Sequence, residues 1–562
     1  MSDEASSNGQ NSLRTSRSSL IKRKKIDDHR NQWLPVAFAA SLFGILATVS
    51  LLLVMALLAI RQKPCEEQTS PDIVLLRENV EQLDRISKQL SSLFEPARIK
   101  QNLRWLAETS HIAGTIENAA LIRRLADKYV QLGFKVKTYN YSVLLNYADF
   151  ENPNTIKVEK EDGTWWRLSR GCGHPSGPPQ AVNEQLDGRS EVWWNAYSAN
   201  GSVVGRIVYC NFGTAEDFRT LDETYPHSPS LPGFGAQRGS VGRVPGDPLT
   251  PLLPSLPYVT RSESMESLRK KGLLPSIPVT PIGYDDAQKI MDYMDGPIVT
   301  RVDWIGGIFV KRTITNIIAI LEGTMEPDRW VMLGNHVDAW GKGAIDPISG
   351  TAVQLEVARV AAKVFGTNPP RRSLVFCHWD AEEFGLIGSS EFIEERLGVL
   401  QTRAIAYINR FITFAGIPAA DVKLEPMPGQ SYALYHTMFE TPWTVENLID
   451  PNFSSLTSVG QLWIEIDIAN GNNGVAFQRL ESINFRLQYI ERSFLDQNTQ
   501  NPYYRHLVFS PSSHSPRFTS FACILDPALD YHLSHNETDL HNLAMAITKV
   551  QYAVETAIDI LH

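Results

Sequence analysis

Strand-like apolar segments alternate with helix-like segments between about residues 316 and 400, and this alternation limits the possible folds more than any other feature. The segments NIIAILEG, RWVMLGNH and RRSLVFCHW have the composition of buried strands. Helical spacing runs from about Ser349 to Val364 and again near Ser389 to Leu397. Such alternation predicts an α/β layer with a largely parallel sheet.

Two other regions differ from this layer in amino-acid composition and periodicity. From about 140 to 310 the chain is dense in glycine and proline, as in GCGHPSGPP, and short β-type runs such as SVVGRIVYCNF lie between these stretches. We expect an irregular β-rich domain there. The last 90 residues carry helical periodicity, most clearly in LHNLAMAITKVQYAVETAIDIL, and predict a helical domain. A chain of 562 residues has room for about three such units.

An apolar segment near the N-terminus predicts a membrane anchor. Residues 33–60 include no charged side chain and can cross a hydrocarbon core of about 30 Å as a helix. A cleaved signal peptide or a buried core helix is the alternative, but both are usually shorter. Lysine and arginine cluster before the segment, which places that side in the cytosol. We therefore expect a single-pass type II plasma-membrane protein whose C-terminal region is extracellular.

Composition excludes one class of partner and leaves disulfides open. The formal charge of −9 and the pI near 5.9 give no electrostatic footprint for nucleic acid. Five cysteines form neither a disulfide scaffold nor a CxxC metal motif. An extracellular C-terminal region would make four sequons plausible glycosylation sites, at Asn140, Asn200, Asn452 and Asn536.

Residues that can bind metal follow the predicted strands. His336 lies just past the strand RWVML, where sites in α/β sheets form, and the carboxylate of Asp338 can orient its imidazole. A lone histidine is nevertheless more often structural. Asp346, in GAIDPISG, is either an ordinary helix N-cap or a carboxylate that bridges two cations.

Adjacent carboxylates occupy the next strand-to-helix junction. Glu382 and Glu383, in WDAEEFG, can simply favour a helix N-terminus. Alternatively, one can ligate zinc while the other takes a proton from the attacking water. The segment ALYHTMFET adds His436, which alone would also be read as structural. The combination of these residues at successive strand ends is stronger than any single one.

The motifs HxD, GxIDPxSG, WDAEEFGLxGS and YxLYHxxxET resemble the glutamate carboxypeptidase II family, which is related to transferrin receptors. The likeness runs from about His111 to the C-terminus and has the character of a shortened form. It implies a zinc-peptidase-type mixed sheet with helices on both faces, an inserted β-rich apical domain and a C-terminal helical domain. It also implies a homodimer that removes acidic C-terminal residues from peptides.

The resemblance assigns roles to individual residues. It implies zinc ligands at His336, Asp346 (bridging), Glu383 and His436, with Glu382 as general acid and base. It implies a structural calcium site, whose residues would be Thr250, Glu391 and Glu394. It further implies that Tyr435 stabilises the tetrahedral intermediate and that substrate contacts come from Ser240, Arg517 and Phe518.

The predicted domain layout combines these interpretations. Its segments are 1–32 (cytoplasmic tail), 33–60 (transmembrane helix), 61–100 (stalk), 101–139 (protease domain, first part), 140–310 (apical domain), 311–470 (zinc peptidase domain, second part) and 471–562 (helical dimerisation-like domain).

The chain departs from the family at several places. Phe411 follows AYIN where the family has an aspartate ligand, and phenylalanine offers no oxygen donor. The spacing from AYIN to LYH is shorter than the family's, and Ser240 stands in place of a substrate-contacting asparagine. Two hypotheses follow: an active extracellular zinc exopeptidase with two zinc ions or one, and a catalytically impaired, receptor-like ectodomain.

Overall fold

The computed structural model describes the chain from residue 85 onward, with gaps. The described residues are 85–159, 162–205, 231–242, 245–259, 262–291, 300–304, 308–367, 369–409, 416–422, 424, 432, 434–471, 486, 489–496, 506–512 and 518–561. All of them belong to one compact unit, 76–562.

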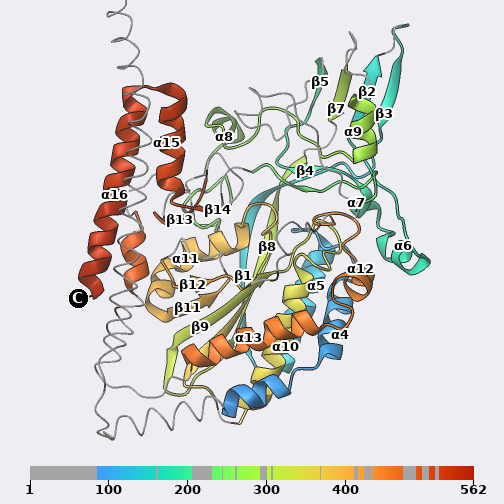
Figure 1. The fold of residues 1–562 in the computed structure, drawn as a ribbon. Helices are drawn as coiled ribbons and strands as arrows, with labels where there is room; N and C mark the ends of the chain where they lie inside the picture. Colours follow the sequence, from blue (N-terminus) through green and yellow to red (C-terminus); the bar gives the residue numbers. More distant parts are fainter. Residues whose placement is uncertain are drawn as a thin grey trace, which may run out of the picture. The chain divides into compact units, whose positions relative to one another are not determined.

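A mixed sheet forms the centre of this unit (Figure 1). Its strand order is β1-β8-β10-β9-β11-β12. The bounds are β1 Lys135–Tyr147, β8 Ile308–Leu321, β9 Glu326–His336, β10 Arg372–Trp379, β11 Ala404–Ile408 and β12 Ala419–Ala420. Strands β9 to β12 pair in parallel, as predicted, whereas β1 and β8 pair antiparallel. The sheet is thus mixed, as the family resemblance implies.

Both faces of the sheet are buried, which explains its continuous apolar strands. Along β10, Leu374 and Phe376 enter one hydrophobic core, whereas Val375 and Cys377 enter the other. This alternation is the two-residue period of a strand. Because β10 is central and buried from Ser373 to Trp379, the loop that follows it starts from a rigid position.

Helices cover both faces of the sheet. Their bounds are α4 Pro96–Leu106, α5 Ile116–Gln131, α10 Ile348–Phe365, α11 Ile387–Arg403 and α13 Ser454–Gly471. Helices α4, α5, α10 and α13 share one core, and α11 lies in the other (Figure 1). Helix α10 is buried on nearly every side because it packs between the sheet, α4 and α13. The sequence prediction of this helix is confirmed to within a residue at each end.

The region between β1 and β8 forms a second, antiparallel sheet of order β3-β2-β7-β5. Its strands are β2 Thr155–Glu159, β3 Trp165–Ser169, β5 Gly201–Gly205 and β7 Thr300–Trp304. A short parallel pair is formed by β4 Asn195–Ala196 and β6 Gly239–Ser240. The small helices of this region are α6 Pro179–Gln185, α7 Gly188–Glu191, α8 Met265–Lys270 and α9 Tyr284–Met291. The inserted β-rich character agrees with the prediction, and the limits at 140 and 310 fall inside β1 and β8.

The C-terminal region is helical, as predicted. It contains α12 Pro442–Thr444, the π-helix η2 Val445–Ile449, the 3-10 helix η3 Glu491–Phe494, β13 Phe509–Pro511, β14 Phe518–Ser520, α15 Ala522–Ser534 and α16 Glu537–Leu561. Helices α15 and α16 pack against each other, and η3 packs on α16 (Figure 1). Small residues make the buried stripe of α16, at Ala546, Ala553 and Ala557.

The predicted single-pass, type II plasma-membrane localisation is corrected by the structure. Within the part of the chain that the structure describes, no helix combines the length and apolar content needed to span a bilayer. The segment predicted as the anchor, 33–60, lies outside the described residues, as do the predicted tail and most of the stalk.

Candidate metal centre

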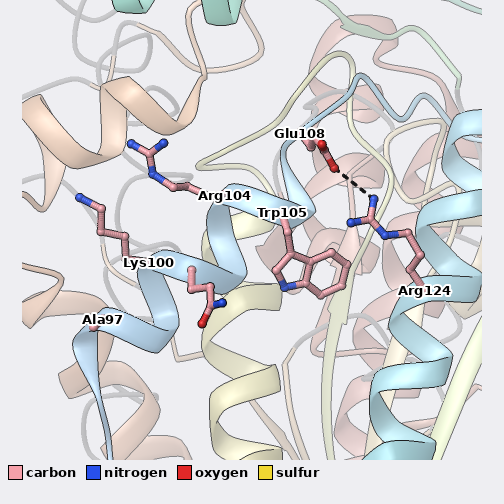
Figure 2. Close-up of a pocket in the computed structure, with 7 residues that line it drawn as sticks. Ala97, Lys100, Arg104, Trp105, Glu108 and Arg124 are labelled. Carbon is pink, nitrogen blue, oxygen red and sulfur yellow. Dashed lines mark hydrogen bonds and ion pairs between the residues drawn. The ribbon is translucent and has the colours of Figure 1, made fainter.

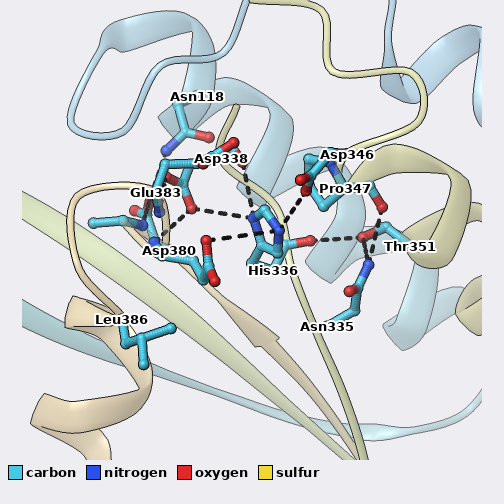
Figure 3. Close-up of polar contacts among 12 residues, drawn as sticks. Asn118, Asn335, His336, Asp338, Asp346, Pro347, Thr351, Asp380, Glu383 and Leu386 are labelled. Atoms are coloured by element: carbon cyan, nitrogen blue, oxygen red, sulfur yellow. Dashed lines mark hydrogen bonds and ion pairs between the residues drawn. The ribbon is translucent and has the colours of Figure 1, made fainter. Parts of the chain in front are cut away.

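The residues predicted to bind metal meet at one edge of the central sheet. His336 ends β9, and Asp346 lies in the turn before α10. Glu382 and Glu383 occupy the turn between β10 and α11, and His436 precedes α12. Figure 3 shows the side chains of His336, Asp346 and Glu383 gathered in this region.

Strand pairing explains why the loops after β9 and β10 meet. The two strands run parallel, and Trp379 is the register partner of His336. Both loops therefore leave the sheet at the same level. The carboxyl ends of parallel strands are where α/β folds bind ligands.

The carboxylate of Asp346 lies between the two histidines. Its Oδ1 is 2.9 Å from His336 Nε2, and its Oδ2 is 3.4 Å from His436 Nε2. Burial opposes its ionisation, but hydrogen bonds from both imidazoles outweigh this effect and lower the pKa of Asp346. One oxygen directed to each histidine is the arrangement expected of a bridging carboxylate.

A complete set of metal-ligand atoms lies on the His436 side. Asp346, Glu383 and His436 each offer one atom, and these atoms all lie within 4.8 Å of one another. Glu383 Oε2 is 3.0 Å from His436 Nε2. Glu383 Oε1 is buried and has no hydrogen-bond partner among the described residues. Two carboxylates and an imidazole suit zinc, so the residues present fit this ion.

The His336 side is less complete. Glu382 Oε2 is 3.8 Å from His336 Nε2, and within the described residues His336 is not part of a three-ligand cluster. The position where the family has its further aspartate, Phe411, lies outside the described residues. The side chain of Glu382 keeps 17% of its surface exposed, whereas that of Glu383 keeps 4%. Glu382 is therefore the more accessible of the pair.

The electrostatics of the metal-free protein favour a protonated Glu382. Burial raises the pKa of Glu382 to about 8; the attraction of His336 opposes this shift, and the repulsion from Glu383 and Asp346 adds to it. For His436, burial lowers the pKa, but the carboxylates of Glu383 and Asp346 raise it well above its usual value. These carboxylates thus stabilise positive charge at the site, including that of a cation.

Asp338 acts differently from its prediction. Its Oδ1 is 3.8 Å from His336 Nδ1, which is too far for a hydrogen bond. The backbone carbonyl of Asp338 instead accepts from Nδ1 at 3.0 Å (Figure 3). Its carboxylate accepts the backbone N–H groups of Glu382 (2.8 Å) and Glu383 (3.3 Å). Asp338 therefore orients the turn that carries both glutamates.

Two of the substrate-binding candidates, Tyr435 and Ser240, have contacts with residues of the site. Tyr435 is 42% exposed, and its ring stacks on that of His436 at 3.6 Å. Burial raises the pKa of its hydroxyl, so this group stays a hydrogen-bond donor. Ser240 Oγ donates to the carbonyl of Phe384 at 3.2 Å. Phe518 begins β14, and Arg517 lies outside the described residues.

Two of the three predicted calcium residues, Thr250 and Glu391, both contact a further acidic residue, Asp247. Glu391 accepts from the backbone N–H groups of Asp247 (2.7 Å) and Ser255 (2.6 Å). The Thr250 hydroxyl donates to Asp247 Oδ2 at 3.4 Å, while Glu394 follows Glu391 in α11. Burial and the charge of Asp247 raise the pKa of Glu391 to about 8. Asp247 was missed in the sequence because its carboxylate is next to Glu391 only in the fold.

The four predicted glycosylation sites are all exposed, at Asn140, Asn200, Asn452 and Asn536. Their use depends on the extracellular location, which the structure does not support.

A groove of about 620 Å³ lies on α4 and α5, away from the metal-ligand residues. Figure 2 shows Trp105 among the residues that line it, together with the ion pair between Glu108 and Arg124, which are 3.2 Å apart. The guanidinium of Arg124 lies 5.2 Å from the Trp105 ring, and Arg104 is paired with Glu446. The charged groups that line the groove thus already have partners, and none of the site residues predicted from the sequence lines this groove.

Two family models match the chain. Residues 316–454 match Peptidase family M28, and residues 453–562 match the transferrin receptor-like dimerisation domain. A glutamate carboxypeptidase 2 homolog of Caenorhabditis briggsae is 29% identical over 534 residues, which cover 68% of this chain and 69% of that protein. Aminopeptidase NAALADL1 of Mus musculus is 32% identical over 414 residues, covering 58% and 54% respectively.

Solved structures resemble the chain only distantly. A zinc aminopeptidase from Bacillus subtilis has a TM-score of 0.45 and 15% identity, covering 68% of this chain and 97% of its own. At this TM-score and identity, the solved structure supports no inference about function. The two family matches and the carboxypeptidase relatives confirm the resemblance seen in the motifs. The chain is thus similar to glutamate carboxypeptidases and transferrin receptor-like proteins, with a segment that matches Peptidase family M28 followed by one that matches the transferrin receptor-like dimerisation domain.

Proposed function

We propose that this protein is a zinc-dependent carboxypeptidase that removes C-terminal glutamate or a similar acidic residue from peptides. The observation that carries the proposal is the cluster of Asp346, Glu383 and His436, whose ligand atoms lie within 4.8 Å of one another. Glu382, the most accessible carboxylate of the adjacent pair, lies beside this cluster.

The roles of the residues follow from their positions. Asp346, Glu383 and His436 would hold a zinc ion, and His336 faces the other oxygen of Asp346. A bound zinc ion acts as a Lewis acid toward the scissile carbonyl. Glu382 takes a proton from the attacking water and returns it to the leaving amine. Tyr435, beside His436, donates a hydrogen bond to the oxygen that becomes negative.

The proposed substrate choice draws on the relatives and on residues beside the glutamate turn. The C. briggsae relative is named a carboxypeptidase and the M. musculus relative an aminopeptidase, so relatives differ in which peptide end their names indicate. Ser240 lies next to the turn with the two glutamates and can contact a substrate there. We assign further substrate contacts to Arg517 and Phe518.

Paired substrates test both halves of the proposal. Purified protein with one equivalent of zinc would be offered N-acetyl-aspartyl-glutamate and, separately, an amino-acid amide with a free amine. We expect glutamate release from the first, and loss of that release in Glu382→Gln. The exposed residue Glu151 supplies the control substitution, Glu151→Gln, which should leave activity unchanged. Hydrolysis of the amide alone would contradict the carboxypeptidase assignment.

The alternative is a catalytically impaired, receptor-like protein. Phe411 stands where the family has an aspartate ligand, and the dimerisation domain is of the transferrin receptor-like type. Metal analysis of the purified protein distinguishes the two. Zinc bound in at least one equivalent together with Glu382-dependent hydrolysis supports the enzyme, whereas absence of both supports the receptor-like protein.

Two further assignments accompany the proposal. The dimerisation-domain match at 453–562 supports a homodimer. Apolar side chains of α15 and α16 remain exposed in the single chain, including Leu529, Leu533, Ile547 and Ile558. We also assign a structural calcium ion to Thr250, Glu391 and Glu394. If this assignment is right, removal of calcium by a chelator should lower the melting temperature.

A further inference from the structure

The backbone of His436 is in the left-handed region, with φ at +58°. Residues with a Cβ avoid this region, and one that occupies it is held there by its surroundings. Because His436 Nε2 is one of the clustered ligand atoms, the groups that hold this backbone also set the direction of the imidazole.

Two residues supply most of the polar contacts of His436. Its backbone N–H donates to Glu440 Oε2 at 3.2 Å. Its carbonyl accepts the backbone N–H of Arg238 at 3.0 Å and the guanidinium Nε–H at 3.4 Å. The carbonyl of Arg238 in turn accepts from His436 Nδ1 at 3.0 Å, which leaves Nε2 for a metal.

Arg238 and Glu440 connect His436 to two other parts of the fold. Arg238 precedes β6 in the inserted region, and its Nη1 donates to the carbonyl of Ser190 in α7. The carbonyl of Glu440 accepts from the backbone N–H of Ala344, close to Asp346. A distortion at either residue would therefore reach both His436 and its neighbouring ligand.

The side chains of Arg238 and Glu440 are both buried. Arg238 is 4% exposed and Glu440 is 3% exposed. Arg238 Nη2 and Glu440 Oε1 have no hydrogen-bond partner among the described residues. Buried polar groups with incomplete hydrogen bonding are costly, and fixing the backbone of His436 would account for this cost.

We propose that Arg238 and Glu440 are positioning residues that lock His436 in its left-handed conformation with Nε2 directed at the metal. The inference rests on the proposed function in one respect, since it takes His436 as a zinc ligand. It adds that the inserted region, through Arg238, contributes to a zinc position whose ligands, together with Glu440, all lie in the M28 segment.

Zinc affinity and amide hydrogen exchange together test the inference. The variants are Glu440→Leu and Arg238→Met, with Glu440→Gln and Arg238→Lys as conservative counterparts. Arg189→Met is the matched control, because Arg189 lies in α7 and pairs with the exposed Glu117. Competition with a chromophoric chelator measures the affinity, and exchange of the peptide around His436 in metal-free protein measures the hold on its backbone.

The expected pattern is a loss that the conservative glutamine restores. Glu440→Leu and Arg238→Met should weaken zinc binding about 10- to 100-fold and speed exchange of the His436 amide. Glu440→Gln keeps an acceptor for that amide and should stay within about threefold of the parent. If Arg238→Met does not fold, Arg238→Lys can replace it, because lysine keeps the positive charge but lacks the planar guanidinium. This variant should show a smaller loss of zinc affinity.

The outcomes separate this inference from the proposed function. Normal zinc affinity and normal exchange in folded Glu440→Leu and Arg238→Met would overturn the inference while leaving the function intact. A parent protein without zinc affinity, whose His436 exchange still depends on Arg238 and Glu440, would support the positioning role and refute the proposed function. If Arg189→Met changed zinc affinity and His436 exchange as much as the other variants do, general destabilisation would explain the changes, and the inference would be overturned.

Discussion

Replacing Asp338 by asparagine tests how the glutamate turn is held. Asp338 is fully buried, and its two carboxylate oxygens accept the N–H groups of Glu382 and Glu383 at 2.8 and 3.3 Å. Asparagine offers a single oxygen, so one of the two N–H groups would face an amide NH₂. The substitution is nearly equal in volume and therefore isolates this effect.

The magnitude follows from the hydrogen bond that is lost. A bond to a charged acceptor contributes about 1.5–3 kcal/mol, and the N–H left without a partner adds a penalty of similar order. Part of this loss is offset, because burial and the charge of Asp338 together raise the pKa of Asp380 to about 7. Removing that charge relieves Asp380. We expect a net loss of about 1–3 kcal/mol, concentrated in the turn.

Two measurements separate the turn from the metal. Thermal melting of metal-free protein reports the stability, and chelator competition reports the zinc affinity. A displaced turn moves Glu383 from His436, so we expect zinc binding to weaken about 10- to 100-fold, or about 1.4–2.7 kcal/mol. Asp338→Ala removes both acceptors and should exceed Asp338→Asn in both measurements.

Two results would refute this reasoning. Unchanged zinc affinity in both variants would mean that the carboxylate of Asp338 does not orient the glutamates. Equal effects of asparagine and alanine would mean that the two N–H bonds are not the source of the loss.

Three further predictions follow from the described contacts. His436→Ala removes one of three clustered ligand atoms, so zinc titration by calorimetry should detect no tight site, and a retained tight site would contradict the assignment. Burial lowers the pKa of His378 to about 3, so the unfolded chain takes up a proton below about pH 6.5 before the folded chain does. The contribution of His378 to the free energy of unfolding should therefore be full above pH 6.5 and fall by about 1.4 kcal/mol per pH unit as pH drops toward 3. In melting curves of His378→Gln the dependence of this free energy on pH should be smaller by the amount that one proton contributes. An unchanged dependence would exclude His378 as its source. Glu446→Gln weakens pairs with the half-exposed Lys100 and Arg104, so its melting temperature should correspond to a loss under about 1 kcal/mol, and a larger loss would show that these pairs are not screened by solvent.

The sequence predicted local elements better than their distant partners. Helix α10 and strand β10 were predicted because both are buried on several sides and therefore carry unbroken apolar patterns. The long antiparallel pairing of β1 with β8 was not predicted. It places Asn140 opposite Thr315, and no local pattern specifies a register between segments so far apart along the chain.

The same distinction applies to the metal centre. The chemistry-bearing residues were found because each follows a strand end, and strands β9 and β10 bring those ends together. The groups that orient them were predicted only in part: Asp338 was expected to orient His336, whereas its contact with Glu382 and that of Arg238 with His436 exist only in the folded chain. A motif specifies residue type and spacing, but not the neighbour that a backbone N–H will face.

This asymmetry bears on how many zinc ions the chain holds. On the His436 side, ligand atoms from Asp346 and Glu383 are present, and contacts from Arg238 fix the imidazole. The His336 side depends on the segment after AYIN, where Phe411 replaces an oxygen donor. The two positions share only Asp346, whose second oxygen already binds His336. Loss of a ligand on the His336 side therefore leaves the three ligands of the other position intact, and the chain can retain one zinc site without the second.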